Sequence, residues 1–179
     1  FTMRILSVSD RIEPSLYDEN APQHYEGVEL ILACGDLPPE YLRFLRNVFD
    51  VPLFYVAGNH DVRYVEQPPM GCMNVHARLI KFNGLKIVGF EGSRWYNGGC
   101  YQYTEAQMRR IVFKISMTLW WHKRIDFIMT HAPPRYIHDA DDLCHRGFKS
   151  YRNLITCFSP RYFIHGHIHS EFENTEIGR

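Results

Sequence analysis

Aspartate, asparagine and histidine side chains directly follow five short apolar runs of this chain, at the point where each run ends. These side chains are Asp10, Asp36, Asn59 with His60, His131, and His167 with His169. Oxygen and imidazole ligands together suit divalent manganese, iron, zinc or nickel, whereas oxygens alone would suit magnesium or calcium. Gly58-Asn59 is also ordinary turn chemistry, so a polar turn is the competing interpretation there. Recurrence after five runs favours a metal site.

The number of candidate ligands indicates two metal ions rather than one. A set of this size, with a carboxylate able to bridge, fits two ions about 3.5–4 Å apart, which hold the attacking and leaving oxygens of a phosphoryl displacement. Such ions also lower the pKa of a bridging water toward about 7 and so supply hydroxide. His60, beside Asn59, is then expected to protonate the leaving alkoxide, with Asp61 orienting its ring.

These side chains require elements that bring distant parts of the chain together. Apolar runs predict strands over residues 3–8, 28–33, 51–56, 125–129 and 161–164. Apolar residues at helical spacing after Pro38-Pro39 predict a helix between the second and third strands, and this crossover implies parallel pairing. Parallel strands present their carboxyl ends at one edge, where open α/β sheets bind ligands. We therefore expect Asp36 and Asn59 to meet at that edge.

The second half of the chain adds a hairpin and two helices. Asn83-Gly84 predicts a tight antiparallel turn between strands over residues 79–82 and 85–90. A Thr-x-x-Gln capping box starts a helix over residues 105–119, and a further helix is expected over residues 151–158. The chain has no internal repeats or linkers, so a single domain is expected.

The composition narrows the class of protein. The chain has 20 basic residues (lysine and arginine) and 20 acidic residues (aspartate and glutamate). Its net charge therefore favours neither nucleic acid nor a membrane as a partner. Five irregularly spaced cysteines argue against a disulfide framework and fit a reducing cytoplasm. No apolar run approaches the roughly 20 residues of a membrane span. We expect one soluble cytoplasmic domain over residues 3–179, preceded by Phe1 and Thr2 as an addition ahead of the natural start.

The order of the motifs resembles that of the calcineurin-like metallophosphoesterases. The matching motifs are Asp10, Gly35-Asp36, Gly58-Asn59-His60-Asp61, Thr130-His131 and Gly166-His167-Ile168-His169. The resemblance implies an α/β fold, a four-layer α/β/β/α sandwich of two mixed sheets, with the metal site at the carboxyl ends of strands. It also implies the role of each ligand. Asp36 would bridge two divalent metal ions, one held further by Asn59, His131 and His167 and the other by Asp10 and His169, while His60 protonates the leaving group.

One departure from the family pattern affects the metal site that Asp10 and His169 would form. The family's Asp-x-His motif reads Asp10-Arg11-Ile12 here, so one imidazole ligand is missing, and Glu13, a water or nothing fills its place. A weak enzyme, or an inactive binding or scaffold protein on the same fold, is therefore the alternative. Exposed aromatic residues would support that alternative, and the candidates are Trp95, Tyr96, Trp120 and Trp121, although the last two are rather expected at the buried end of a helix. A closed structural zinc site is a third interpretation.

The expected substrate is a small phosphate ester or nucleotide, a monoester or a diester. Candidates for contacts with its phosphate are Arg94, Arg135, His138 and His145. The balanced charge makes dedicated nucleic-acid binding unexpected. Family members commonly continue with further strands after the last motif, so C-terminal strands are expected to be missing beyond Arg179.

Overall fold

In a computed structural model, which describes residues 3–122 and 124–168, the chain is an α/β fold built on two four-stranded sheets. The first sheet contains, in spatial order, β1 (Arg4–Val8), β2 (Val28–Ala33), β3 (Leu53–Tyr55) and β4 (Met73–Asn74). The second contains β10 (Tyr162–His165), β9 (Phe127–Thr130), β6 (Leu85–Phe90) and β5 (Leu79–Phe82). Every described pairing of the first sheet is parallel. The second is mixed, because β5 and β6 form the predicted antiparallel hairpin while β6, β9 and β10 run parallel.

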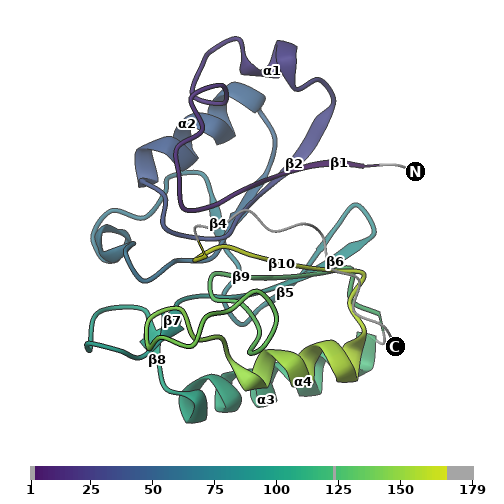
Figure 1. The fold of residues 1–179 in the computed structure, drawn as a ribbon. Helices are drawn as coiled ribbons and strands as arrows, with labels where there is room; N and C mark the ends of the chain where they lie inside the picture. Colours follow the sequence, from purple (N-terminus) through teal and green to yellow (C-terminus); the bar gives the residue numbers. More distant parts are fainter. Residues whose placement is uncertain (1–2, 123, 169–179) are drawn as a thin grey trace.

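Helices cover the outer face of each sheet (Figure 1). On the side of the first sheet lie α1 (Ala21–His24) and α2 (Pro39–Phe49), and on the side of the second lie α3 (Glu105–His122) and α4 (Lys149–Phe158). A 3-10 helix, η1 (Val62–Val65), follows β3, and two short strands, β7 (Ser93–Arg94) and β8 (Gln102–Tyr103), pair in the loop between β6 and α3. The layers therefore follow the order helix, sheet, sheet, helix.

Three apolar cores hold these layers together, and the alternation of side chains along each strand explains them. In β2, Ile31 packs toward α2 with Leu45, while the next residue, Leu32, packs between the two sheets. In β6, Ile87 joins the core between the sheets and Val88 joins the core under α3 and α4. All five side chains are fully buried. Because each sheet is covered on both faces, its central strands are continuous apolar runs in the sequence.

The differences from the predicted elements concern short or terminal segments. The strands β4, β7 and β8 were not expected, because two residues are too few to show an alternating pattern. Helix α3 continues three residues past the predicted end at position 119, and Trp120 and Trp121 are 72% and 87% exposed. The expectation that these tryptophans form a buried helix end is therefore wrong. Within the described residues, no helix has the length and hydrophobicity needed to cross a membrane.

The parallel register places the carboxyl ends of six strands together. The last residues of these strands lie in register, namely Val8, Ala33 and Tyr55 in the first sheet and Phe90, Thr130 and His165 in the second. Each loop that carries a predicted ligand leaves from one of these ends. The two sheets thus position the candidate metal ligands at the edge that the sequence indicates.

Candidate metal centre

Three ligand-type side chains converge at this edge. One carboxylate oxygen of Asp36 and one ring nitrogen each of His131 and His167 all lie within 4.8 Å of one another. Both imidazoles are buried, and Asp36 is half-buried. Asp36 and His167 have φ values of 57° and 70°, in the left-handed region, where the chain turns sharply after a strand. Three residues that lie far apart along the chain thus form one ligand cluster.

The hydrogen bonds of His131 fix which ring nitrogen faces the cluster. Its Nδ1 lies 2.7 Å from the carbonyl oxygen of Cys34, to which it donates its proton. Its Nε2 then faces two oxygens, Oδ1 of Asn59 at 3.0 Å and Oδ2 of Asp36 at 3.3 Å. In a neutral ring these are three acceptors directed at one another, an arrangement that requires a cation. The donor set therefore fits a divalent metal bound by imidazole, amide and carboxylate groups.

The pKa of His131 reflects the same arrangement. Burial lowers the pKa of the ring, but the hydrogen bond to Asp36 and the charge of that carboxylate outweigh burial and raise it overall. A proton on Nε2 thus balances the cluster in the metal-free protein. Because metal binding needs the unprotonated nitrogen, we expect a metal ion to displace this proton.

The side chain of Asn59 is oriented by a residue that sequence reasoning did not connect with it. Its Nδ2 donates a hydrogen bond of 3.1 Å to the hydroxyl oxygen of Tyr96, which leaves Oδ1 directed at His131. Tyr96 comes from the loop that contains β7 and β8. The sequence indicated only an aromatic side chain in a loop, because a contact 37 residues away leaves no local pattern.

A backbone carbonyl likewise orients His167. Its Nε2 donates to the carbonyl oxygen of Cys144 over 2.8 Å, so Nδ1 remains as the nitrogen that can bind metal. Burial lowers the pKa of His167 to about 4, and the neighbouring His131 acts in the same direction. The ring is therefore neutral near pH 7, as a metal ligand must be. The last predicted ligand, His169, lies outside the described residues.

Asp10 lies beside His167, but its carboxylate is not part of the three-residue cluster. Both oxygens accept the backbone N–H of His167, at 2.9 and 3.0 Å. Ile12, at the place of the missing imidazole, is 41% exposed. Glu13 accepts the hydroxyl and backbone N–H of Ser15 at 2.8 and 3.2 Å, so its carboxylate closes a local turn. These contacts do not support Glu13 as the replacement ligand.

Two glycines allow the loops to approach closely. A Cβ on Gly35 would lie 2.6 Å from the backbone nitrogen of Gly58 and 2.7 Å from Nδ1 of His131. A Cβ on Gly58 would collide with the carboxylate of Asp36. Gly35 also has φ 92°, which disfavours other residues. The Gly-Asp and Gly-Asn-His-Asp motifs therefore need glycine for space at the cluster.

Asp61 holds the loops of the site together through their backbones. Its carboxylate accepts the N–H groups of Gly58, Asp36 and Leu37 at 2.7, 2.8 and 3.1 Å. These bonds use both oxygens and tie the loops together, while the expectation that Asp61 orients the ring of His60 stays a prediction. Burial raises the pKa of Asp61 to about 7, against the opposing effect of the Gly58 N–H. His60 itself is exposed, and its backbone N–H donates to Asp36 over 2.9 Å.

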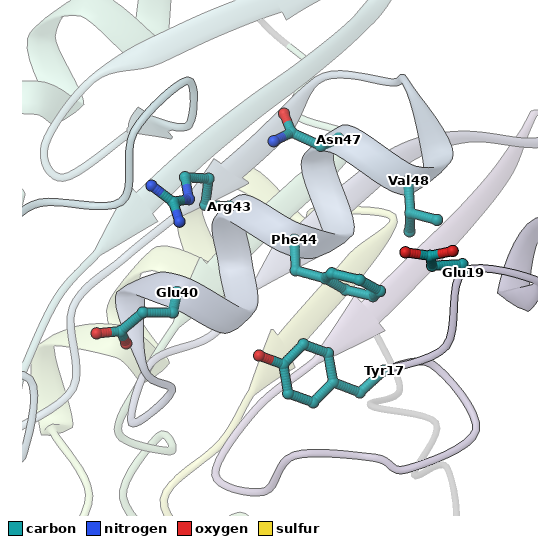
Figure 2. Close-up of a pocket in the computed structure, with 7 residues that line it drawn as sticks. All are labelled: Tyr17, Glu19, Glu40, Arg43, Phe44, Asn47 and Val48. Carbon is teal, nitrogen blue, oxygen red and sulfur yellow. The ribbon is translucent and has the colours of Figure 1, made fainter.

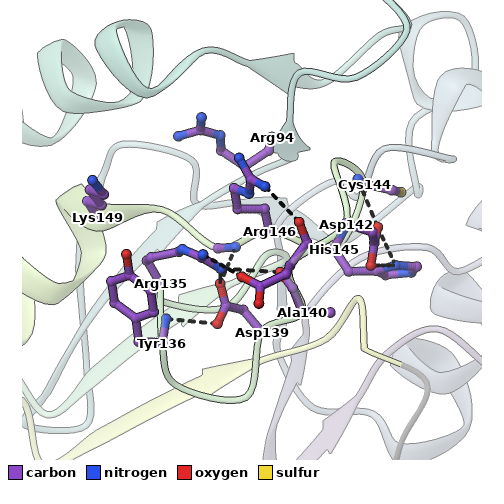
Figure 3. A network of polar contacts seen from close by, with 12 residues as sticks. Arg94, Arg135, Tyr136, Asp139, Ala140, Asp142, Cys144, His145, Arg146 and Lys149 are labelled. Atoms are coloured by element: carbon purple, nitrogen blue, oxygen red, sulfur yellow. Dashed lines mark hydrogen bonds and ion pairs between the residues drawn. The ribbon is translucent and has the colours of Figure 1, made fainter.

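The four residues expected to contact phosphate all have partners within the protein, and Figure 3 shows contacts of two of them, Arg135 and His145. The guanidinium of Arg94 pairs with Glu105 at 2.6 Å. That of Arg135 pairs with Asp139 and Asp141, each at 2.6 Å. Both arginines are thus already charge-compensated.

The two histidines of this group also have polar partners. Nδ1 of His138 is 3.3 Å from Nε2 of His165, and Nδ1 of His145 is 3.0 Å from Asp142. The ring centroid of His145 is 5.2 Å from that of His167. The structure thus brings His145 beside a candidate ligand.

A separate surface pocket of about 490 Å³ lies along α2 and contains none of the predicted site residues (Figure 2). In its wall, the rings of Tyr17 and Phe44 meet edge to face with centroids 4.6 Å apart. Arg43 and Glu40 reach toward solvent on the same helix. These residues pack the loop before α1 against α2, and they offer no cluster of metal ligands.

Comparison with known proteins agrees with this centre. A sequence model of the calcineurin-like phosphoesterases matches residues 8–171, a range that contains every predicted ligand. The chain belongs to this family. Membership supports a hydrolase that acts on phosphate esters with the help of divalent metal ions, and Asp36, His131 and His167 form a cluster that could hold such an ion.

A solved structure shows the same fold. This crystal structure aligns with a TM-score of 0.66 and 14% sequence identity, over 95% of this chain and 86% of that one. Identity this low supports a shared fold and nothing about substrate. No curated protein matches the chain.

Proposed function

We propose that this phosphoesterase hydrolyses small phosphomonoesters or phosphodiesters with two divalent transition-metal ions, manganese, iron, zinc or nickel. The observation that carries the proposal is the convergence at Nε2 of His131, where oxygens of Asn59 and Asp36 face a buried nitrogen. Such a group of acceptors needs a positive charge, which the proton on Nε2 supplies in the metal-free protein and a metal ion would supply in its place. Bound metal ions would polarise the phosphoryl group and lower the pKa of a water molecule.

Each residue has a distinct task in this proposal. Asn59, His131 and His167 would hold one metal ion and Asp10 and His169 the other, with Asp36 as a ligand that could serve both. His60 is exposed beside the cluster and donates a proton to the leaving oxygen of the substrate. Asp61 keeps the loops of Asp36 and Asn59 at a fixed spacing through its three backbone hydrogen bonds. A cytoplasmic location is supported by the five cysteines, all of which are free thiols.

A leaving-group series on the metal-loaded enzyme tests the role of His60. We expect His60→Asn to lower kcat by about 100-fold or more on alkyl phosphates, and by less on nitrophenyl phosphates, whose leaving group needs no proton. Metal content should stay unchanged. His24→Asn, at an exposed histidine of α1, is the matched control and should retain full activity. Absence of turnover in the wild type, or equal loss on both substrates, would refute the assigned mechanism.

A scaffold function is the second candidate, and two observations favour it. Trp120 and Trp121 are exposed rather than buried, and Ile12 removes one predicted metal ligand. Under this alternative, the metal-loaded wild type would show no turnover of any phosphate ester while Ile12→His would gain it. Turnover by the wild type that depends on His60 would exclude a purely structural role.

A further inference from the structure

Helix α3 carries large apolar side chains on both of its faces. Met108, Val112 and Leu119 are buried against the second sheet. The opposite face carries Phe113, Met117, Trp120 and Trp121, which are 69%, 66%, 72% and 87% exposed. Their spacing of four, three and one residues places them along one side of the helix. This aromatic stripe, as we call these four residues, is larger than the scattered single apolar residues of an ordinary surface.

Basic side chains border the aromatic stripe. Arg109, Arg110 and Lys114 are exposed on the same side of α3, and with Phe113 they line a hollow of about 300 Å³. At 3.6 residues per turn, Arg110 falls within the arc of the stripe, while Arg109 and Lys114 lie about 20° outside its two edges. The outward face of α3 therefore combines large aromatic groups with several positive charges.

Negative charge is scarce in this helical layer. Glu105 is the one acidic residue within α3 and α4. Its carboxylate pairs with Arg94 and accepts the backbone N–H groups of Lys149 and Ser150 at the start of α4. It thus offers little compensation to the exposed cations. The chain is neutral as a whole, but this layer is basic, which a net charge cannot reveal.

We propose that the aromatic stripe and its flanking cations dock the protein on the surface of a bilayer that contains anionic phospholipids. Aromatic side chains, tryptophan above all, favour the interface between headgroups and acyl chains, while arginine and lysine pair with lipid phosphates. A second copy of the chain fits less well, because it would bring two sets of cations together without acidic partners. The helix lies on the surface rather than spanning it, since its other face is part of the protein core.

Vesicle sedimentation with the full chain tests this proposal. At low salt, about 0.1 M, we expect at least about tenfold more protein on vesicles with about 30% phosphatidylglycerol than on phosphatidylcholine alone. Trp120→Ser with Trp121→Ser should remove binding, and Arg109→Glu with Arg110→Glu should reduce it at least tenfold. Tryptophan fluorescence should shift to shorter wavelength on binding in the wild type. Neither readout depends on turnover, so the result is independent of the proposed phosphoesterase activity.

Matched variants on the other side of the molecule are the controls. Arg43→Glu with Arg63→Glu makes the same change in charge, and Val65→Ser with Met70→Ser removes apolar residues that are 67% and 69% exposed. Both should bind vesicles like the wild type. Equal loss in the controls, or no preference for anionic vesicles, would overturn the proposal. A stable dimer that the tryptophan variant dissociates would also overturn it, in favour of self-association through α3.

Discussion

Replacing Asp61 tests whether this residue supports the loops or the ring of His60. Its carboxylate accepts three backbone N–H groups, from Gly58, Asp36 and Leu37. In Asp61→Asn, the amide oxygen can keep the two bonds made by Oδ2, while the NH₂ group meets the Leu37 N–H as a second donor. Loss of one charge-assisted bond plus one unsatisfied buried donor costs about 2–3 kcal/mol. Asp61→Ala leaves all three donors unsatisfied and should cost about 3–6 kcal/mol.

Thermal unfolding of the chelated, metal-free protein measures this effect separately from catalysis. For a domain of this size, Asp61→Asn should lower Tm by about 5–10 °C, and Asp61→Ala should lower it further. Asp18→Asn is the matched control, because Asp18 also accepts a backbone N–H, from Asn20 at 2.7 Å, but in an exposed turn. Its Tm should change little. If Asp61→Asn leaves Tm unchanged and lowers kcat alone, Asp61 acts through His60 and the loop-supporting role is wrong.

Three further perturbations test other contacts of the structure. Tyr96→Phe removes the acceptor for the Asn59 amide, so affinity for the first metal bound should fall about tenfold in calorimetric titration, with Tm of the metal-free protein nearly unchanged. Ile12→His should raise the number of metal ions retained after dialysis, measured by elemental analysis, and an unchanged number would mean that position 12 lies outside the centre. Burial lowers the pKa of His76, whose Nδ1 accepts the backbone N–H of Glu91, and the Glu91 carboxylate opposes this only in part. Because the unfolded chain binds that proton more readily, the wild type should lose stability as pH falls below about 6.5, by at most about 1.4 kcal/mol per pH unit. His76→Asn, which keeps an acceptor there, should lose less in denaturant titrations at pH 7 and pH 5.

Much of the fold follows from local patterns in the sequence. The run at residues 28–33 matches β2 residue for residue, and Asn83-Gly84 lies at the turn of the β5–β6 hairpin. Strands covered on both faces are continuously apolar, and helices between them force parallel pairing. This reasoning is sufficient to bring Asp36 and Asn59, which follow neighbouring strands of the first sheet, to one edge. It could not find β7 and β8, because their pairing depends on a loop conformation rather than on hydrophobic periodicity.

The contacts that tune the ligands were beyond sequence reasoning for a different reason. The carbonyls of Cys34 and Cys144 select the ring nitrogens of His131 and His167, and a backbone carbonyl is the same group in every residue type. Nothing in the sequence marks which carbonyl will be used. The hydroxyl of Tyr96 is more distinctive, but only the fold shows that it lies against Asn59. Sequence patterns therefore identify ligands far better than the groups that orient them.

The two proposed metal positions differ in which groups orient their ligands. One position would be formed by Asn59, His131 and His167. Each of these side chains is oriented by a group that is not itself a ligand. Asp10 instead depends on the backbone N–H of His167, so its carboxylate is placed by a ligand of the other ion. Ordering His167 by metal binding should therefore also order Asp10. The missing imidazole at position 12 then weakens the site of Asp10 and leaves the site of Asn59, His131 and His167 intact. We therefore predict that the two ions bind one after the other rather than together.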